Sequence, residues 1–119
     1  MQVHFSYHNV PRTEQIDRVI QKNLRKLERL LSHFAPDLVH LHGTLESNGT
    51  HKNTVVSLNL ALPTGQLHSR EQDASLLKDL QSCFDQIVAQ LKKHKEALRR
   101  EESWRRERPK RAAAGRSRP

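Results

Sequence analysis

Apolar and polar positions along the chain follow two different periods, and each period predicts a kind of element. Alternation with a period of two predicts strands over residues 3–7, 39–45, 53–62 and 66–70. Apolar residues spaced three and four apart predict helices over about 14–31 and 76–100. The predicted order is therefore β-α-β-β-β-α.

Each predicted helix carries one apolar stripe that has to be buried. The first stripe is formed by Ile16, Val19, Ile20, Leu24, Leu27 and Leu31. The second is formed by Leu76, Leu77, Leu80, Phe84, Ile87, Val88, Leu91 and Leu98. Two such helices suffice to cover one face of a four-stranded sheet. We expect an α+β two-layer sandwich with both helices on one face and polar side chains such as His4, Ser6, Ser57 and Asn59 on the other.

Short polar segments mark the ends of these elements. Thr13 is a good N-cap for the first helix, and Asp73 or Ser75 for the second. Turns are expected at residues 47–50 and 63–65, and residues 35–37 should close the first helix. The apolar period stops after Glu102. We therefore expect one α+β domain over residues 1–101 and a basic disordered tail over 102–119.

Charge is distributed unevenly along the 119 residues, whose formal net charge is +8. Residues 1–87 hold nine basic and nine acidic residues, whereas residues 88–119 hold twelve basic and four acidic ones. A one-sided positive field favours a polyanion, either a nucleic acid or an anionic membrane surface. No apolar run approaches the roughly 20 residues of a membrane span, and the N-terminus does not resemble a signal peptide. We expect a cytoplasmic protein with no membrane partner.

The basic residues of both helices form exposed stripes. On the first helix they are Arg18, Lys22, Arg25, Lys26 and Arg29; on the second they are Lys92, Lys93, Lys95, Arg99 and Arg100. A single run of this kind is usually a solvated face. Two runs on helices that cover the same sheet face predict a basic groove that follows a phosphate backbone. Aromatic residues are few, so the contacts should go to phosphate and sugar.

Other chemistry finds little support in the sequence. The chain has eight histidines, and His40 and His42 share a strand face, but no cysteine or glutamate completes a ligand set. Cys83 is the only cysteine and lies near an apolar stripe, so it should be buried and inert. No phosphate loop, nucleophile elbow or carboxylate pair is present. We expect no enzymatic activity, metal, cofactor or small-molecule substrate.

The sequence resembles the ribosome hibernation-promoting factors, also called ribosome-associated inhibitors or sigma-modulation proteins. The resemblance covers residues 1 to about 100. It is carried by the order of elements, by the run Gln90-Leu91-Lys92-Lys93-His94-Lys95, which is similar to the family's Gln-Leu-x-Lys-His-Lys, and by Lys26-Leu27-Glu28. The chain resembles the short form of the family, without the additional C-terminal domain that pairs ribosomes.

The resemblance implies a function that composition alone does not give. Members bind the small ribosomal subunit in the channel of messenger and transfer RNA, and hold ribosomes inactive under stress. Matching positions carry over Lys26, Lys93, His94, Lys95 and Arg99. The stripes of this sequence complete the expected RNA-binding set as Lys22, Arg25, Lys26, Arg29, Lys92, Lys93, His94, Lys95, Arg99 and Arg100. The partner is ribosomal RNA of the small subunit, and the free protein should be a monomer.

Several positions depart from the family pattern. A tyrosine near the start of the second helix is absent from residues 75–80, Asn23 stands near a family lysine, and the tail is basic where some short members are acidic. Two other functions stay open from the residues. One is a generic RNA-binding protein or RNA chaperone, and the other is a protein-interaction regulator of a sigma factor.

Overall fold

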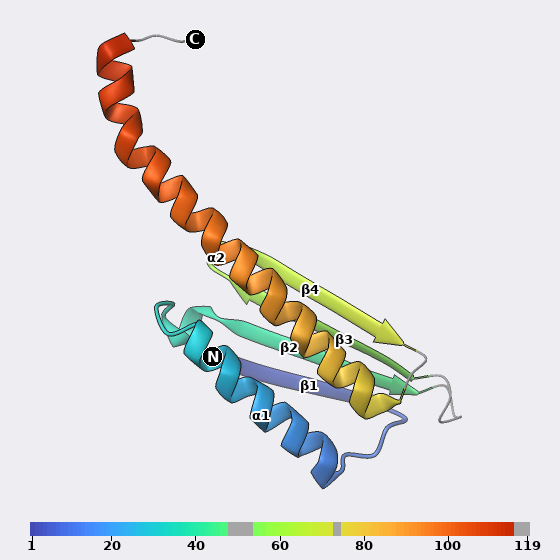
Figure 1. Ribbon diagram of the computed structural model, residues 1–119. Coiled ribbons are helices and arrows are strands. Elements are labelled where there is room, and N and C mark those ends of the chain that lie inside the picture. Colours follow the sequence, from blue (N-terminus) through green and yellow to red (C-terminus); the bar gives the residue numbers. More distant parts are fainter. Residues whose placement is uncertain (48–53, 73–74, 116–119) are drawn as a thin grey trace. The chain divides into compact units, whose positions relative to one another are not determined.

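The computed structural model describes the backbone of residues 1–47, 54–72 and 75–115, and within these ranges the side chains as far as residue 101. Its elements are β1 (Gln2–His8), α1 (Glu14–Leu30), the short 3-10 helix η1 (Pro36–Leu38), β2 (His40–Ser47), β3 (Thr54–Leu62), β4 (Gly65–Gln72) and α2 (Leu76–Gly115). Figure 1 shows the helices and strands, coloured along the sequence. The chain divides into two compact units, Met1–Val88 and Ala89–Pro119, and each is described by itself below.

The four strands form one mixed sheet in the order β1-β2-β3-β4. β1 and β2 are parallel because α1 connects them as a crossover, whereas β2, β3 and β4 pair antiparallel in succession. In the first unit, α1 and the start of α2 lie on the same face of this sheet (Figure 1). The predicted α+β sandwich with the order β-α-β-β-β-α is confirmed.

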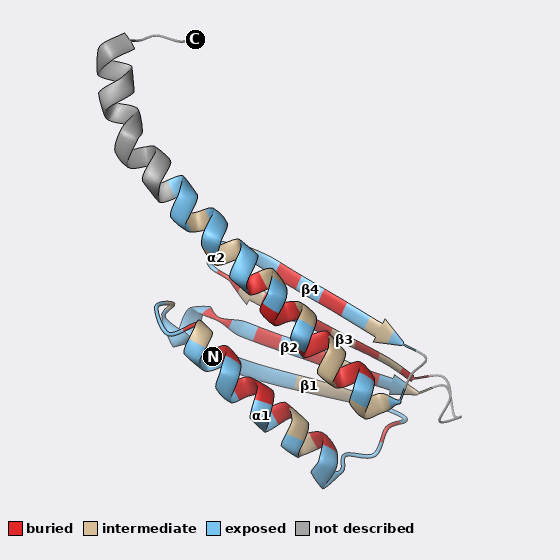
Figure 2. Cartoon of the chain, in the orientation of Figure 1, coloured by how far each residue is buried: buried red, intermediate tan, exposed pale blue. Residues whose placement is uncertain are grey.

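The core lies between this sheet face and the two helices (Figure 2). β3 alternates strictly, with Val56, Leu58 and Leu60 fully buried. The other core residues are Leu41 and Leu45 of β2, Ile16, Ile20, Leu24 and Leu27 of α1, and Leu80, Cys83, Phe84 and Ile87 of α2. Burial of each large apolar side chain stabilises the fold by about 1.5–3 kcal/mol relative to exposure.

The register places Val3, Phe5 and Tyr7 of β1 on the helix-covered face, as predicted, but none of them is buried and the exposure of β1 does not alternate. Val3 is 41 % exposed, and Phe5 and Tyr7 are half-buried. β1 has a neighbour on one side only, so its inward side chains are covered from one side. At its end Asn9 adopts a φ of 58°, which asparagine tolerates, and its Nδ2 donates to the carbonyl of Ser47 at 3.3 Å.

Both predicted helix starts are observed where the structure describes them. The Thr13 hydroxyl accepts from the Ile16 N–H at 3.2 Å, and the Ser75 hydroxyl accepts from the Lys78 N–H at the same distance. Asp73 and residues 48–50 of the predicted turn lie outside the described residues.

The first helix ends close to its predicted end, whereas the second helix continues beyond its own. α1 ends at Leu30, and the chain then turns into η1 at the residues expected to close the helix. α2 continues to Gly115, whereas the apolar period predicted an end near residue 100. Arginine, glutamate and alanine favour a helix without needing burial, and these residues fill the segment after residue 100. The division of the chain into a domain at 1–101 and a tail at 102–119 remains a prediction.

Candidate RNA interface

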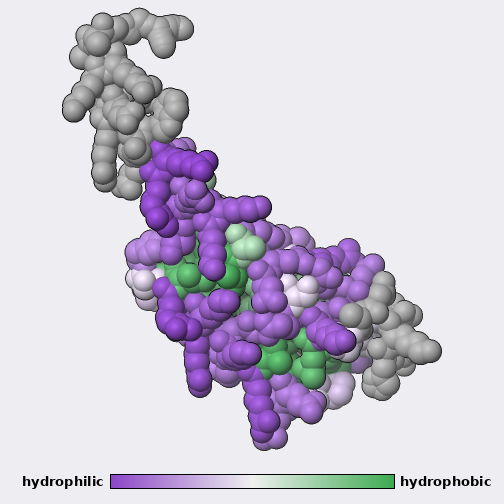
Figure 3. Space-filling model, in the orientation of Figure 1, coloured by the Kyte–Doolittle hydropathy of each residue, from purple (hydrophilic) through white to green (hydrophobic). Residues whose placement is uncertain are grey.

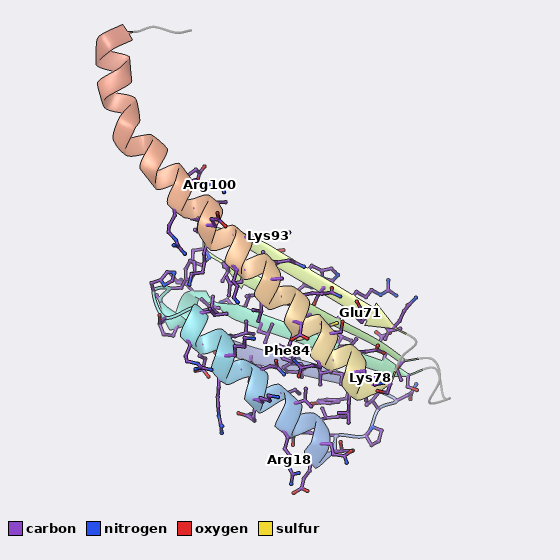
Figure 4. All side chains as sticks on the ribbon, in the orientation of Figure 1. Arg18, Glu71, Lys78, Phe84, Lys93 and Arg100 are labelled. Carbon is purple, nitrogen blue, oxygen red and sulfur yellow. The ribbon has the colours of Figure 1, made fainter. Side chains whose placement is uncertain are left out.

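α1 presents its basic residues to solvent along the side opposite its buried stripe. Ile16, Ile20, Leu24 and Leu27 face the sheet, while the basic residues Arg18, Lys22, Arg25, Lys26 and Arg29 are all exposed. A helix advances 3.6 residues per turn, so a stripe spaced by four, three and four follows one side of it. Figure 4 shows Arg18 at the start of α1, directed away from the sheet. The predicted stripe of α1 is thus an accessible surface.

One flank of α1 faces the start of α2, and Asn23 identifies it. Asn23 is only 5 % exposed. Its Nδ2 donates to Gln81 Oε1 at 3.0 Å, and Gln81 Nε2 donates back to Asn23 Oδ1 at 3.1 Å. Lys26 lies one turn after Asn23 and Lys22 immediately before it, so these two lysines lean toward the α2 flank.

The opposite flank of α1 carries its acids. Asp17 accepts from Arg12 Nε at 3.0 Å, and this hydrogen bond raises the pKa of Arg12. Glu14 lies 3.9 Å from Arg18 in an exposed pair, and Glu28 is exposed on the same flank as Asp17. The helix surface is therefore polarised, with lysines toward α2 and carboxylates toward the β1 edge of the sheet.

The first turns of α2 are held to the sheet by polar contacts as well as apolar ones. The hydroxyl of Ser69 donates to the Cys83 carbonyl at 3.0 Å, and the Gln86 amide donates to Glu71. Asp79 is buried and accepts from the Thr54 hydroxyl at 3.2 Å. In the first unit, the described part of α2 exposes one cation, Lys78 (Figure 4).

The second unit contains the other predicted residues on one stretch of helix. Lys92, Lys93, Arg99 and Arg100 are exposed, and His94 and Lys95 are half-buried. Lys92, Lys95 and Arg99 are spaced three and four apart and share one side of the helix. Arg100 donates to Glu96 at 2.9 Å, so part of its charge is balanced. Lys93 and Arg100 lie seven residues apart on a second stripe.

The ten residues predicted to bind RNA thus fall into two sets. Four lie on the exposed stripe of α1 in the first unit, and six lie on residues 92–100 of α2 in the second unit. The groove between these two sets remains a prediction. Figure 3 shows a helix-bearing surface that is mainly hydrophilic, with smaller apolar areas among the polar side chains.

Cys83 takes no part in this surface. Its side chain is fully buried, and the thiol donates to the Val56 carbonyl at 3.3 Å. Burial raises its pKa from about 9 to about 11, so the thiol stays protonated at neutral pH. The prediction that this cysteine is buried is confirmed.

Among the described residues, no group of three or more histidine, cysteine, aspartate or glutamate side chains is placed to hold a metal ion. No helix in these ranges is long and apolar enough to cross a membrane.

Sequence reasoning missed the role of Asn23 and Gln81. Asn23 was noted only as standing near a family lysine, yet it is the buried residue that links α1 to α2. A polar residue on the margin of the apolar stripe was the available signal. Its partner lies 58 positions further along the chain, and spacing alone does not identify such a partner.

Comparisons with known proteins agree with this architecture. The family model described as sigma 54 modulation protein / S30EA ribosomal protein matches residues 3–99. The N-terminal domain of Protein Y from Thermus thermophilus is similar, with a TM-score of 0.64 and 21 % identity, covering 79 % of this chain and 99 % of that one. A ribosomal subunit interface protein from Coxiella burnetii has a TM-score of 0.62 and 17 % identity, covering 81 % and 99 %. The chain belongs to the sigma 54 modulation protein / S30EA ribosomal protein family, the family of hibernation-promoting factors that its sequence resembles.

Proposed function

We propose that the protein binds the small ribosomal subunit in the channel of messenger and transfer RNA and holds the ribosome inactive under stress. The observation that carries the proposal is the exposed basic stripe of α1 in a chain of this family. The similar structure from Coxiella burnetii is a ribosomal subunit interface protein, which agrees with a ribosomal partner. The setting is the cytoplasm.

The mechanism is steric and electrostatic, with no bond made or broken. The folded domain occupies the space that RNA ligands need. Lysines and arginines neutralise phosphates and release their counterions, so affinity should fall steeply with salt concentration. Each phosphate contact on double-stranded RNA should contribute slightly less than one to the slope of log affinity against log salt, by analogy with duplex DNA. A sigma-factor regulator would instead form a protein complex with weak salt dependence.

Charge reversal on the second unit tests the proposal most directly. Lys93→Glu/Lys95→Glu should abolish co-sedimentation with ribosomes in a sucrose gradient while thermal unfolding is unchanged, because the reversed charges repel phosphate. The matched control is Lys78→Glu, which makes the same substitution on the same helix outside the predicted set. It is compared with the single variant Lys93→Glu. Co-sedimentation of the double variant at moderate salt equal to that of the unmodified protein would contradict the assignment.

The two flanks of α1 give a second test. Lys22→Glu/Lys26→Glu should weaken ribosome binding about 30-fold, since two lost phosphate contacts at about 1 kcal/mol each amount to about 2 kcal/mol. Glu28→Lys adds a charge on the opposite flank and should change binding by less than about threefold. The measurement is the dissociation constant for small subunits at fixed salt. A large gain from Glu28→Lys would place the RNA on the acidic flank instead.

A further inference from the structure

The sheet face opposite the helices carries a row of imidazoles. The strand register places His4, His42, Asn59 and His68 side by side, one from each strand. All four are exposed, and their neighbours along the strands at Leu41 and Leu58 are buried on the other face. We call His4, His42 and His68 with Asn59 the histidine row.

Contacts within the histidine row hold its rings in place. The rings of His4 and His42 meet edge to face, with centroids 5.1 Å apart. His68 Nδ1 lies 2.9 Å from Asn59 Oδ1, within hydrogen-bond distance. His4 Nε2 also lies 3.4 Å from the Ser6 hydroxyl.

The charge of this face depends on protons. Its permanent charges are one arginine and one carboxylate, Arg70 and Glu46, which offset each other. Every other titratable side chain that the register places on this face is an imidazole: His4 and His8 from β1, His40 and His42 from β2, and His68 from β4. An imidazole ordinarily gains charge in the range of about pH 5 to 8. Protonated imidazoles would therefore add positive charge to a face whose permanent charges cancel.

The chemistry of the face suits single-stranded RNA. Imidazole rings stack on bases, imidazolium groups bind phosphates, and the amide and hydroxyls of Asn59, Ser57 and Thr44 form hydrogen bonds to base edges. A membrane surface suits it less, because membrane-binding faces insert large apolar side chains. Among the described residues the exposed large apolar side chains are Val3 and Leu38, and neither lies on this face.

We propose that the histidine row is a second RNA contact, which binds single-stranded RNA when its imidazoles are protonated. The contact is separate from the basic helix faces and goes beyond the proposed function. When protonated, His4 and His42 carry like charges side by side, and a phosphate bound alongside both rings offsets them. RNA binding is therefore coupled to proton uptake, and the affinity rises as pH falls.

The test uses the full chain and a labelled oligouridylate, titrated over a salt series at about pH 6 and about pH 8. The variant is His4→Gln/His42→Gln/His68→Gln, and the control is His33→Gln, an exposed histidine after α1 and off the sheet. A chelator in all samples excludes metal held by neighbouring imidazoles. At pH 6 the variant should bind about 10- to 100-fold more weakly, with a salt slope smaller by about 2, as three lost contacts to a single strand require. At pH 8 the variant and the unmodified protein should bind oligouridylate with the same affinity.

Other outcomes separate this proposal from its rivals. Equal salt slopes of the variant and the unmodified protein at pH 6 would overturn it. If the variant lost acid-dependent binding to phosphatidylserine vesicles while its binding to oligouridylate was unchanged, the partner of the histidine row would be a membrane and not RNA. The increase in affinity for oligouridylate at acid pH should persist in Lys93→Glu/Lys95→Glu. If the unmodified protein failed to bind ribosomes at neutral pH, the proposed function would fail while this increment remained.

Discussion

The two faces of the sheet are built from the same strands, yet they differ in almost every physical property. On β3, Leu58 is fully buried, while its neighbours Ser57 and Asn59 point to the other face. The inner face is apolar and closed by helices, and the outer face is polar and open. A strand places successive side chains on opposite faces, so a single strand contributes to both. The apolar core and the polar open surface therefore use alternate positions of the same strands.

The two faces of the sheet also differ in their ionisable side chains. On the inner side burial raises the pKa of the Cys83 thiol to about 11, so that group stays neutral from acid pH to well above neutrality. On the outer side lie five histidines, all of them exposed: His4, His8, His40, His42 and His68.

The largest expected effect is the loss of a side chain from the inner face. Leu58→Ala should lower the free energy of unfolding by about 2–5 kcal/mol, because it removes buried methyl groups and leaves a cavity at the centre of the sheet. Chemical denaturation measures it. Asn59→Ala, one position along β3, is the matched control and should cost well under half as much. Similar losses for both variants would mean that the two faces contribute equally to stability.

A smaller effect is expected from adding a group to the inner face. A methyl group at Gly43 would overlap the ring of Phe5 and approach Leu58 Cδ2 to 2.9 Å. Gly43→Ala should therefore cost about 1–3 kcal/mol. Gly43 and Leu58 are register partners, so the double variant Gly43→Ala/Leu58→Ala should lose less stability than the sum of the two single variants. A strictly additive result would show that Phe5 alone determines the cost.

The alternation that separates the faces could be predicted from the sequence, because period two is a local property. Val56, Leu58 and Leu60 are buried as predicted, and so are Leu41 and Leu45. The exposure of β1 could not be predicted in the same way. Val3 carries the same pattern as the inner strands, and only the strand order reveals that it lies at an edge.

In the candidate interface too, some features follow from the local sequence and others depend on contacts between distant residues. The basic stripe of α1 follows from spacing within one helix, and each of its residues is exposed as expected. The polarity of α1, with lysines near Asn23 and acids near Asp17, depends on which flank meets α2. The amide pair of Asn23 and Gln81, two residues from distant parts of the chain, marks that flank.

The smallest effect is expected from the histidine row. In His4→Gln/His42→Gln/His68→Gln all three side chains are exposed, and glutamine retains hydrogen-bonding groups. At about pH 8 the free energy of unfolding should change by no more than about 0.5 kcal/mol, as for other surface substitutions. Denaturation curves of the variant and the unmodified protein measure the difference. A loss above about 1 kcal/mol at pH 8 would show that the row helps to hold the strands together, and the outer face would then share the structural role of the inner one.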